Sequence, residues 1–156
     1  MKSAIIAFGS NLGNRKLHFE KTLSELRNSG IEITKYAGLI ESSPQNMGNC
    51  TKMFLNTVIL VKTELDPFLL LKKLKTIEIK LGRVANQKSL SLPRTVDLDI
   101  IFYDDFICES IELTIPHPNY KERSFVLKPL LEIAPNWVDP LLNITVNEVY
   151  QQCFFS

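Results

Sequence analysis

The sequence is poor in the residues that build disulfide frameworks, membrane spans and nucleic-acid surfaces. Its 156 residues include three cysteines without a CxxC spacing, which argues against a disulfide scaffold and a zinc site. No apolar run approaches the roughly 20 residues of a membrane helix, and the first one is too short for a signal peptide. The formal net charge is +1, so no strongly basic face is expected. We therefore expect a cytoplasmic single domain over residues 1–156, without membrane or nucleic-acid partners.

The most informative stretch is residues 93–105, in which polar and apolar residues alternate after Pro-Arg-Thr. A period of two indicates a strand. Asp97 and Asp99 would therefore share one face, with Cα atoms about 6.5–7 Å apart. The opposite face would be apolar and would carry Val96, Leu98, Ile100 and Phe102. The pattern predicts a core strand whose first half carries paired carboxylates.

Paired carboxylates beside an arginine favour one particular chemistry. Two Asp side chains can bracket a pair of cations ~3.5–4 Å apart, and Mg²⁺ prefers carboxylate oxygens together with substrate phosphates. Arg94 would supply positive charge for the same phosphates. A strand with a solvated polar edge and no function explains the same residues. The pattern alone leaves both interpretations open.

The hydrophobic periodicity elsewhere predicts an α+β fold. Further strands are expected at residues 3–8, 31–41 and 53–61. Two helices should begin after Asn14 and Asp66, because both residues have side-chain oxygens that cap helix N-termini. The order strand-helix-strand-strand-helix-strand is that of a ferredoxin-like antiparallel sheet with helices packed on it.

The C-terminal third should be built from smaller pieces. We expect residues 106–108 to return as a hairpin partner of the preceding strand, and another short strand near 112–115. The apolar residues from Val126 to Ile133 indicate a helix that Pro129 interrupts early. A last helix should start at Thr145, where Glu148 completes a capping box.

Several polar residues could belong to a site, and each has a simpler explanation. The loop at 9–14 could cradle a phosphate, but it lacks the known phosphate-loop motifs, and a tight turn explains it. Asn56 is polar on an apolar strand and would either tie down a loop or bind a polar ligand. Glu78, at the edge of a helix's apolar stripe, would form a salt bridge. His117 and Arg123 form a cationic cluster.

The loop that precedes the carboxylates is basic at both ends. Arg83 and Arg94 flank a polar stretch that contains Lys88 and shows no periodicity. Such a loop suits a lid over a polyphosphate, although an ordinary surface loop has the same composition.

Taken together, the motifs resemble those of the 6-hydroxymethyl-7,8-dihydropterin pyrophosphokinase family. The resemblance covers nearly the whole chain and ends before the C-terminal turns. Its two most specific blocks are Pro-Arg-Thr-x-Asp-Leu-Asp at residues 93–99 and His-Pro with Arg-x-Phe-Val-Leu at residues 117–127. The other matching segments are residues 8–13, 54–56, 82–83 and 128–135.

The resemblance implies transfer of pyrophosphate from ATP to the hydroxymethyl group of the dihydropterin, with release of AMP. It implies that Asp97 and Asp99 hold two Mg²⁺ ions and, with Arg83 and Arg94, make up the catalytic group. It also implies ATP contacts from Glu78, Lys88, His117 and Arg123.

For the pterin, the resemblance implies a sandwich between two aromatic rings, because flat ligands stack on such rings. Those rings would be Phe54 and Phe125, and Asn56 would bind the edge of the pterin. Backbone groups around Ser43, Pro44 and Gln45 would complete the pocket, and Gly9 would leave room for the ligand. We expect a monomer.

Three positions depart from the pattern that the family usually shows. Ala85 stands where a second arginine is common, the loop over 83–92 has no tryptophan, and Leu92 replaces a frequent glycine. These departures concern closure of the loop and its contacts with ATP. Lys88 could substitute for the missing arginine, and we expect the affinity for ATP to depend more on Arg94 than it does in relatives.

Two other classes of protein remain alternatives. A two-metal phosphodiesterase or nuclease could use the same two carboxylates, but the near-neutral charge argues against it. A non-enzymatic ferredoxin-like binding domain would bind its ligand without turnover and would tolerate Asp97→Asn and Asp99→Asn.

Overall fold

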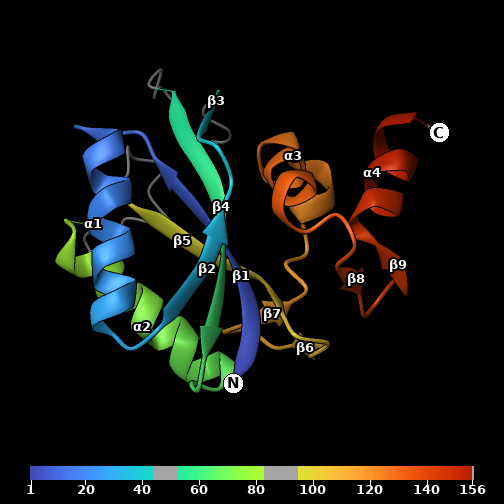
Figure 1. Cartoon of the computed structure of the whole chain (residues 1–156), viewed down its shortest axis with the longest axis horizontal. Helices are drawn as coiled ribbons and strands as arrows, with labels where there is room; N and C mark the ends of the chain where they lie inside the picture. Colours follow the sequence, from blue (N-terminus) through green and yellow to red (C-terminus); the bar gives the residue numbers. More distant parts are fainter. Residues whose placement is uncertain (44–52, 83–94, 156) are drawn as a thin grey trace.

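The chain forms a five-stranded antiparallel sheet with helices on both faces (Figure 1). In this computed structural model, residues 1–43, 53–82 and 95–155 are described. The strands are β1 (Lys2–Ser10), β2 (Glu32–Tyr36), β3 (Ile40–Ser42), β4 (Phe54–Thr63) and β5 (Asp97–Tyr103). Their order is β2-β4-β1-β5, and β3 also pairs with β4. The ferredoxin-like prediction is confirmed, because all these pairings are antiparallel and the two long helices follow β1 and β4.

Helices α1 (Arg15–Asn28) and α2 (Pro67–Lys80) cover one face of the sheet. Both begin where the capping residues predict. The Asn14 side chain accepts a hydrogen bond from Leu17 N at 3.1 Å, and the Asp66 side chain accepts one from Leu69 N at 2.9 Å. Their buried residues join the first core cluster, which includes Phe19, Leu23, Leu26, Leu70, Leu74 and Ile77. Burial of this apolar face, more than helix propensity, holds the two helices in place.

Helices α3 (Ser124–Ile133) and α4 (Val146–Phe155) lie on the other side of the sheet (Figure 1). The prediction that Pro129 interrupts the helix is wrong, because α3 runs through it. Pro129 is buried together with Leu127 and Leu130, so the apolar contacts of this helix outweigh the one backbone hydrogen bond that proline removes. The capping box of α4 is confirmed: Thr145 Oγ1 accepts from Glu148 N at 3.1 Å, and Glu148 Oε1 accepts from Thr145 N at 3.0 Å.

A register shift in β5 shows that one prediction is wrong: Phe102 does not share a face with Leu98 and Ile100. Ile5 and Ile6 of β1 are neighbours, but their partners Phe102 and Ile100 are two residues apart. One residue of β5 therefore bulges, and side chains beyond it change sides. Phe102 consequently joins the second core cluster with α3 and α4, whereas Leu98 and Ile100 pack in the first.

Two other predicted strands also differ from the structure. The strand expected over 31–41 is divided into β2 and β3, which both lie beside β4. Tyr36 pairs with Ile59 and Ile40 with Asn56, so four steps along this segment match three along β4, and the regular pairing is interrupted at residues 37–39. Residues 106–108 do not return beside β5. Instead, β6 (Cys108–Glu109) pairs with β7 (Thr114–Ile115) in a separate two-stranded sheet.

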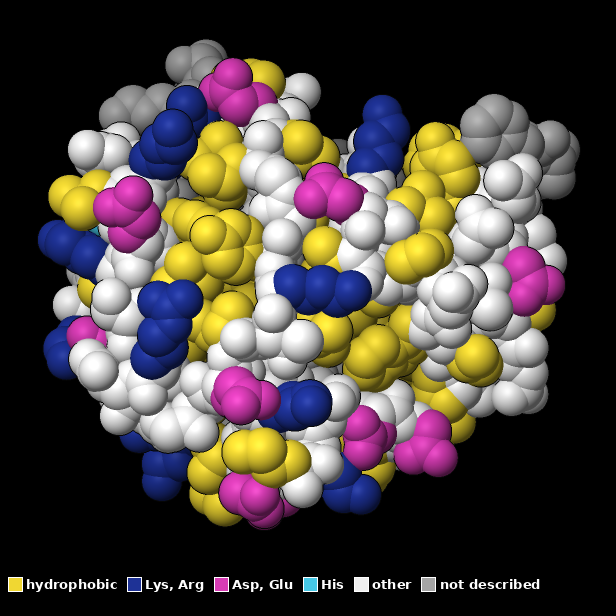
Figure 2. Space-filling model, in the orientation of Figure 1, with side chains coloured by type: hydrophobic (Ala, Val, Ile, Leu, Met, Phe, Trp, Pro, Cys, Tyr) yellow, Lys and Arg dark blue, Asp and Glu magenta, His cyan; other side chains and the backbone are white. Residues whose placement is uncertain are grey.

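The last segments pack around α3. A 3₁₀ turn, η2 (Tyr120–Glu122), precedes α3, and β8 (Val138–Asp139) pairs with β9 (Ile144–Thr145) before α4. Charges of both signs are interspersed over the face drawn in Figure 2, in keeping with a net charge of +1. None of the described helices is long and apolar enough to cross a membrane.

Candidate functional site

One cavity collects most of the polar residues that the sequence singles out. Its volume is about 260 Å³, just below the roughly 300–1,000 Å³ that small-molecule pockets usually have. The walls come from β1, β4 and β5, from Ser42 and Ser43 at the end of β3, from His117, and from the start of α3. Residues far apart in the sequence therefore meet at one end of the sheet.

The floor of the cavity is a row of paired residues across three strands. Gly9 of β1 is the register partner of Asp97 on β5 and of Asn56 on β4. Ala7, the next residue on that face, is the partner of Asp99. Because β1 carries only small side chains here, the polar groups on both sides face an open space.

Asp97 and Asp99 line this space together, which confirms that they share one face of the strand. Both are partly exposed, whereas Leu98 between them is buried in the core. The backbone N–H of Leu98 donates to Glu78 Oε2 at 2.7 Å. Among the described strands β5 lies at the edge of the sheet, so this buried glutamate satisfies a donor on the side of β5 that faces away from β1.

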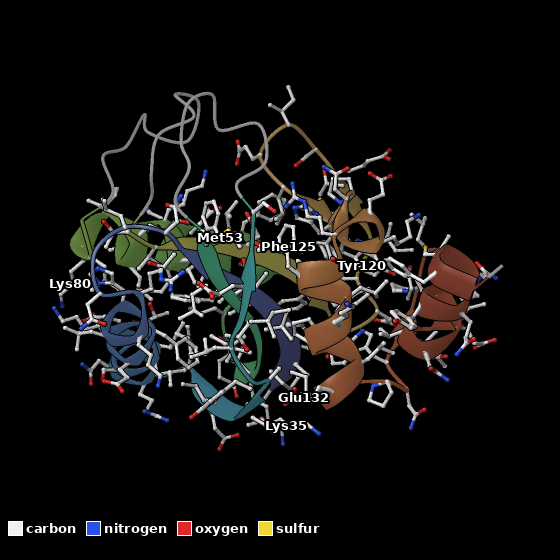
Figure 3. All side chains as sticks on the ribbon, turned by 90° about the horizontal axis from the view of Figure 1, so that it is seen from above. Lys35, Met53, Lys80, Tyr120, Phe125 and Glu132 are labelled. Atoms are coloured by element: carbon white, nitrogen blue, oxygen red, sulfur yellow. The ribbon has the colours of Figure 1, made fainter. Side chains whose placement is uncertain are left out.

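Two aromatic rings, Phe54 and Phe125, line the cavity from different elements. Phe54 opens β4, and Phe125 lies in the first turn of α3. Figure 3 shows Phe125 at the end of α3 and Met53, which precedes Phe54, at the same end of the molecule. In the described part of the chain, neither ring contacts another aromatic ring. The apolar faces are thus available to a flat ligand.

Asn56 is held by the strands around it and faces the cavity. Only 4% of it is exposed. Its Nδ2 donates to Ser42 Oγ at 2.8 Å, to Ile40 O at 3.2 Å and to Phe54 O at 3.3 Å. The amide therefore does tie down β3, one of the two roles that the sequence leaves open, and these bonds fix the orientation of the whole group.

The cationic wall comes from the segment between β7 and α3. His117 and Arg123 both line the cavity. His117 N donates to Ile101 O at 2.9 Å, and His117 Nδ1 accepts from Asn119 N at 3.1 Å. In the neutral ring the proton therefore lies on Nε2. Arg123 supplies the positive charge of this wall. It occupies the N-cap position of α3 without a capping bond from its side chain, and the N-terminus of a helix adds positive potential for anions.

Not every predicted site residue can be placed in this cavity. Arg83, Lys88, Arg94, Pro44 and Gln45 lie outside the described residues, as do Ala85, Leu92 and Cys50. Glu78 is described but does not line the cavity. It is 5% exposed, and the contact given above is with the backbone of β5 rather than with a basic side chain. Its contact with ATP stays a prediction.

The structure adds residues that the sequence does not single out. Ala7, Ser42, Thr57 and Ile101 also line the cavity. The period-two pattern could have placed Ile101 beside Asp99, and Ala7 beside Gly9. Arg15 binds Glu41 Oε2 at 2.8 Å and Met53 O at 2.9 Å, which joins α1 to the chain neighbours of Ser42 and Phe54, two residues that line the cavity. No local pattern predicts that contact.

The donor set fits a hard cation that binds together with a phosphate. The described residues contain no group of three or more His, Cys, Asp or Glu side chains that could hold a metal on their own. Asp97 and Asp99 supply two carboxylates, and Mg²⁺ commonly takes one or two, completing its shell with substrate phosphates and water. The site is thus a cleft with a carboxylate pair, a cationic wall and two aromatic faces, as suits phosphate transfer to a planar ligand.

Comparisons with known proteins agree with this description. Residues 5–135 match the family model described as 7,8-dihydro-6-hydroxymethylpterin-pyrophosphokinase (HPPK). The chain is 35% identical over 151 residues to the 2-amino-4-hydroxy-6-hydroxymethyldihydropteridine pyrophosphokinase of Aquifex aeolicus, covering 95% of this chain and 90% of that protein. The chain therefore belongs to the HPPK family.

Longer proteins are also similar. The chain is 40% identical over 152 residues to the folic acid synthesis protein fol1 of Pneumocystis carinii, covering 97% of this chain but 20% of that protein. A solved structure of Plasmodium falciparum HPPK-DHPS has a TM-score of 0.78 and 18% identity, covering 97% of this chain and 45% of that one. The latter likeness supports the fold alone.

Proposed function

We propose that this protein transfers pyrophosphate from ATP to the hydroxymethyl group of 6-hydroxymethyl-7,8-dihydropterin and releases AMP, as a step of folate synthesis. Membership of the HPPK family supports the reaction. The observation that carries it to this site is that two carboxylates, one arginine, one histidine and two aromatic rings line one cavity.

In the proposed reaction, the hydroxyl oxygen of the pterin attacks the β-phosphorus of ATP. A bond forms between that oxygen and the β-phosphorus, and the bond from the β-phosphorus to the bridging oxygen of the α-phosphate breaks in line. AMP leaves with the bridging oxygen, and the hydroxyl proton is lost. Positioning and charge neutralisation supply most of the catalysis in such reactions.

The residues have separate proposed tasks. Phe54 and Phe125 would hold the pterin by its faces and Asn56 by its edge, with Gly9 leaving room for it. Further pterin contacts are assigned to the backbone at Ser43, Pro44 and Gln45. The basic side chains assigned to the ATP phosphates are Arg83, Lys88, Arg94, His117 and Arg123. Asp97 and Asp99 would hold two Mg²⁺ ions, which when bound neutralise phosphate charge.

The test is AMP release from ATP with Mg²⁺, with and without 6-hydroxymethyl-7,8-dihydropterin. We expect pterin-dependent AMP from the wild type and at least a hundredfold loss in Asp97→Asn and Asp99→Asn, because a charged metal ligand is removed. Asp105→Asn is the matched control, since Asp105 is an exposed residue in the turn after β5. It should keep the wild-type rate.

The two alternatives give different results in the same assay. Tight pterin binding without AMP would contradict the reaction and favour a binding domain. Cleavage of a nucleic acid by the wild type, lost in Asp97→Asn, with no effect of pterin, would favour a nuclease.

A further inference from the structure

A buried hydrogen bond joins the C-terminal unit, β8 to α4, to the segment that carries the cationic wall. Tyr120 Oη donates to Asp139 Oδ2 at 2.5 Å, and each residue is only 1% exposed. Tyr120 lies between α3 and α4 (Figure 3). Asp139 lies on β8, beyond the residues that match the family model, which end at 135.

The backbone of Tyr120 is bonded to the backbone of both His117 and Arg123. Tyr120 N donates to His117 O at 3.5 Å, and Arg123 N donates to Tyr120 O at 3.3 Å. Tyr120 is therefore the centre of the segment that presents His117 and Arg123 to the cavity. A shift of Tyr120 would be passed to both residues, because its backbone is hydrogen-bonded to each of them.

The ring of Tyr120 is fixed on two sides. It makes an edge contact with Phe102 of β5, with ring centroids 5.0 Å apart, and Phe102 in turn stacks on Trp137 at 5.7 Å. The hydroxyl group is anchored by Asp139, whose other oxygen, Oδ1, accepts from Leu141 N at 2.8 Å and from Leu142 N at 3.1 Å.

A buried carboxylate needs such donors. Without these donors the desolvation of the carboxylate would be costly, and the loss of any one donor leaves an acceptor atom unsatisfied. Burial, and then the hydrogen bond from Tyr120 to Asp139, raises the pKa of the tyrosine hydroxyl above its ordinary value. The tyrosine therefore stays protonated and remains a donor throughout the physiological range.

We propose that Tyr120 and Asp139 are a positioning pair that holds His117 and Arg123 in place for an anionic ligand. The proposal rests on the proposed function, in which that ligand is the ATP triphosphate. Neither residue of the pair lines the cavity, so the effect passes through the backbone of residues 117–123.

The first test is Tyr120→Phe against Tyr103→Phe. Tyr103 is the matched control, because its hydroxyl also makes a short bond, to Leu65 O at 2.6 Å, and it is 5% exposed. It lies at the far end of β5 from Asp97. Both variants should lose thermal stability. Only Tyr120→Phe should lower kcat/KM for ATP. We expect a loss of about tenfold, which is the size of the contribution of one charge-assisted hydrogen bond. The affinity for pterin, measured without ATP, should stay within about twofold of the wild type.

A second measurement does not depend on turnover. The chain has two histidines, so the ring-nitrogen NMR signals of His117 can be assigned with His18→Gln. Tyr120→Phe should shift the His117 Nδ1 signal, which reports the bond from Asn119 N, whereas Tyr103→Phe should leave it unchanged. An unchanged His117 signal in Tyr120→Phe would overturn the positioning role even if the proposed reaction were wrong.

Asp139→Asn provides a milder variant if Tyr120→Phe fails to fold. It keeps an acceptor for the tyrosine but removes the charge, so we expect a smaller loss of kcat/KM for ATP. The double variant should lose less than the product of the two single losses, because both substitutions act on one bond. Independent effects, or equal effects of Tyr103→Phe and Tyr120→Phe on kcat/KM, would contradict the proposal and leave the bond a purely structural one.

Discussion

Gly9 and Asp97 are register partners on neighbouring strands, and both line the cavity. An ideal Cβ atom on Gly9 would lie 3.4 Å from Asn56 Oδ1 and 3.4 Å from Phe54 Cδ1. The missing side chain therefore leaves a space bounded by a carboxylate, an amide and an aromatic ring. Strand pairing, rather than any single motif, brings these three groups together.

Filling that space should block the ligand without unfolding the protein. Gly9→Val places a β-branched residue in a strand, which strands tolerate well, but its methyl groups would occupy the cavity floor. We expect pterin affinity to fall by at least about tenfold, or ~1.4 kcal/mol, with a smaller effect for Gly9→Ala. Isothermal titration calorimetry measures this directly.

The control for this variant is Gly38→Ala, whose new Cβ would lie an ordinary 3.6 Å from Glu132 Oε1. It should bind pterin like the wild type. Wild-type affinity in Gly9→Val would mean that the pterin does not occupy this floor.

Replacing Asn56 should cost both stability and binding. Asn56→Ala leaves the carbonyls of Ile40 and Phe54 without the Nδ2 donor, at a cost of about 1–3 kcal/mol for buried unsatisfied groups. Chemical unfolding measures the stability, and pterin titration measures the binding. Ser42→Ala removes one acceptor only, so it should lose less stability than Asn56→Ala and keep pterin binding.

Asn28→Ala is a suitable control, because Asn28 is exposed at the end of α1. Equal stability of Asn56→Ala and Asn28→Ala would contradict the structural role of this amide.

Glu78 should act on the carboxylate pair through the strand. Glu78→Ala leaves the N–H of Leu98 without this acceptor, so we expect about 1–3 kcal/mol of lost stability and a lower kcat as the strand shifts. Glu78→Gln keeps an acceptor oxygen and should be closer to the wild type in both measurements. Glu20→Ala, on the exposed side of α1, serves as the control.

Steady-state kinetics with ATP separates two roles of Glu78. A raised KM for ATP in Glu78→Gln, without loss of stability, would instead support the ATP contact that the family resemblance implies.

His18 should make stability depend on pH. Burial, and then the charge of Lys21, lowers the pKa of His18 below its ordinary 6.5, and its buried Nδ1 has no hydrogen-bond partner among the described residues. The unfolded chain therefore binds a proton more readily than the folded one. The stability that depends on neutral His18 is fully present above pH 6.5 and is lost as pH falls toward the lowered native pKa.

Unfolding free energies of wild type and His18→Gln from pH 7.5 to 4.5 would measure this. The wild type should lose more stability than the variant on acidification. Parallel curves would show that His18 titrates alike in the folded and unfolded chains.

Local signals in the sequence correctly predicted the parts of the fold that depend on neighbours along the chain. The caps at Asn14 and Asp66 and the capping box of α4 formed where expected, because each is closed by hydrogen bonds within three residues. The shared face of Asp97 and Asp99 follows from strand geometry in the same way.

Longer-range pairing decided the rest. The bulge in β5 is set by its register with β1, so no pattern within β5 could reveal that Phe102 changes sides. The course of α3 through Pro129 depends on burial against other elements, and the partner of β6 depends on a residue seven positions away, Ile115.

The sequence by itself determined the family and the chemical groups of the site, because these are carried by residue types at fixed spacing. Only the tertiary structure decided how those groups meet. It placed Gly9 between Asp97 and Asn56, gave Glu78 the backbone of β5 as a partner, and joined Tyr120 to Asp139. Such contacts link residues far apart in sequence, and their pairing is fixed by packing and strand register, which no local pattern records.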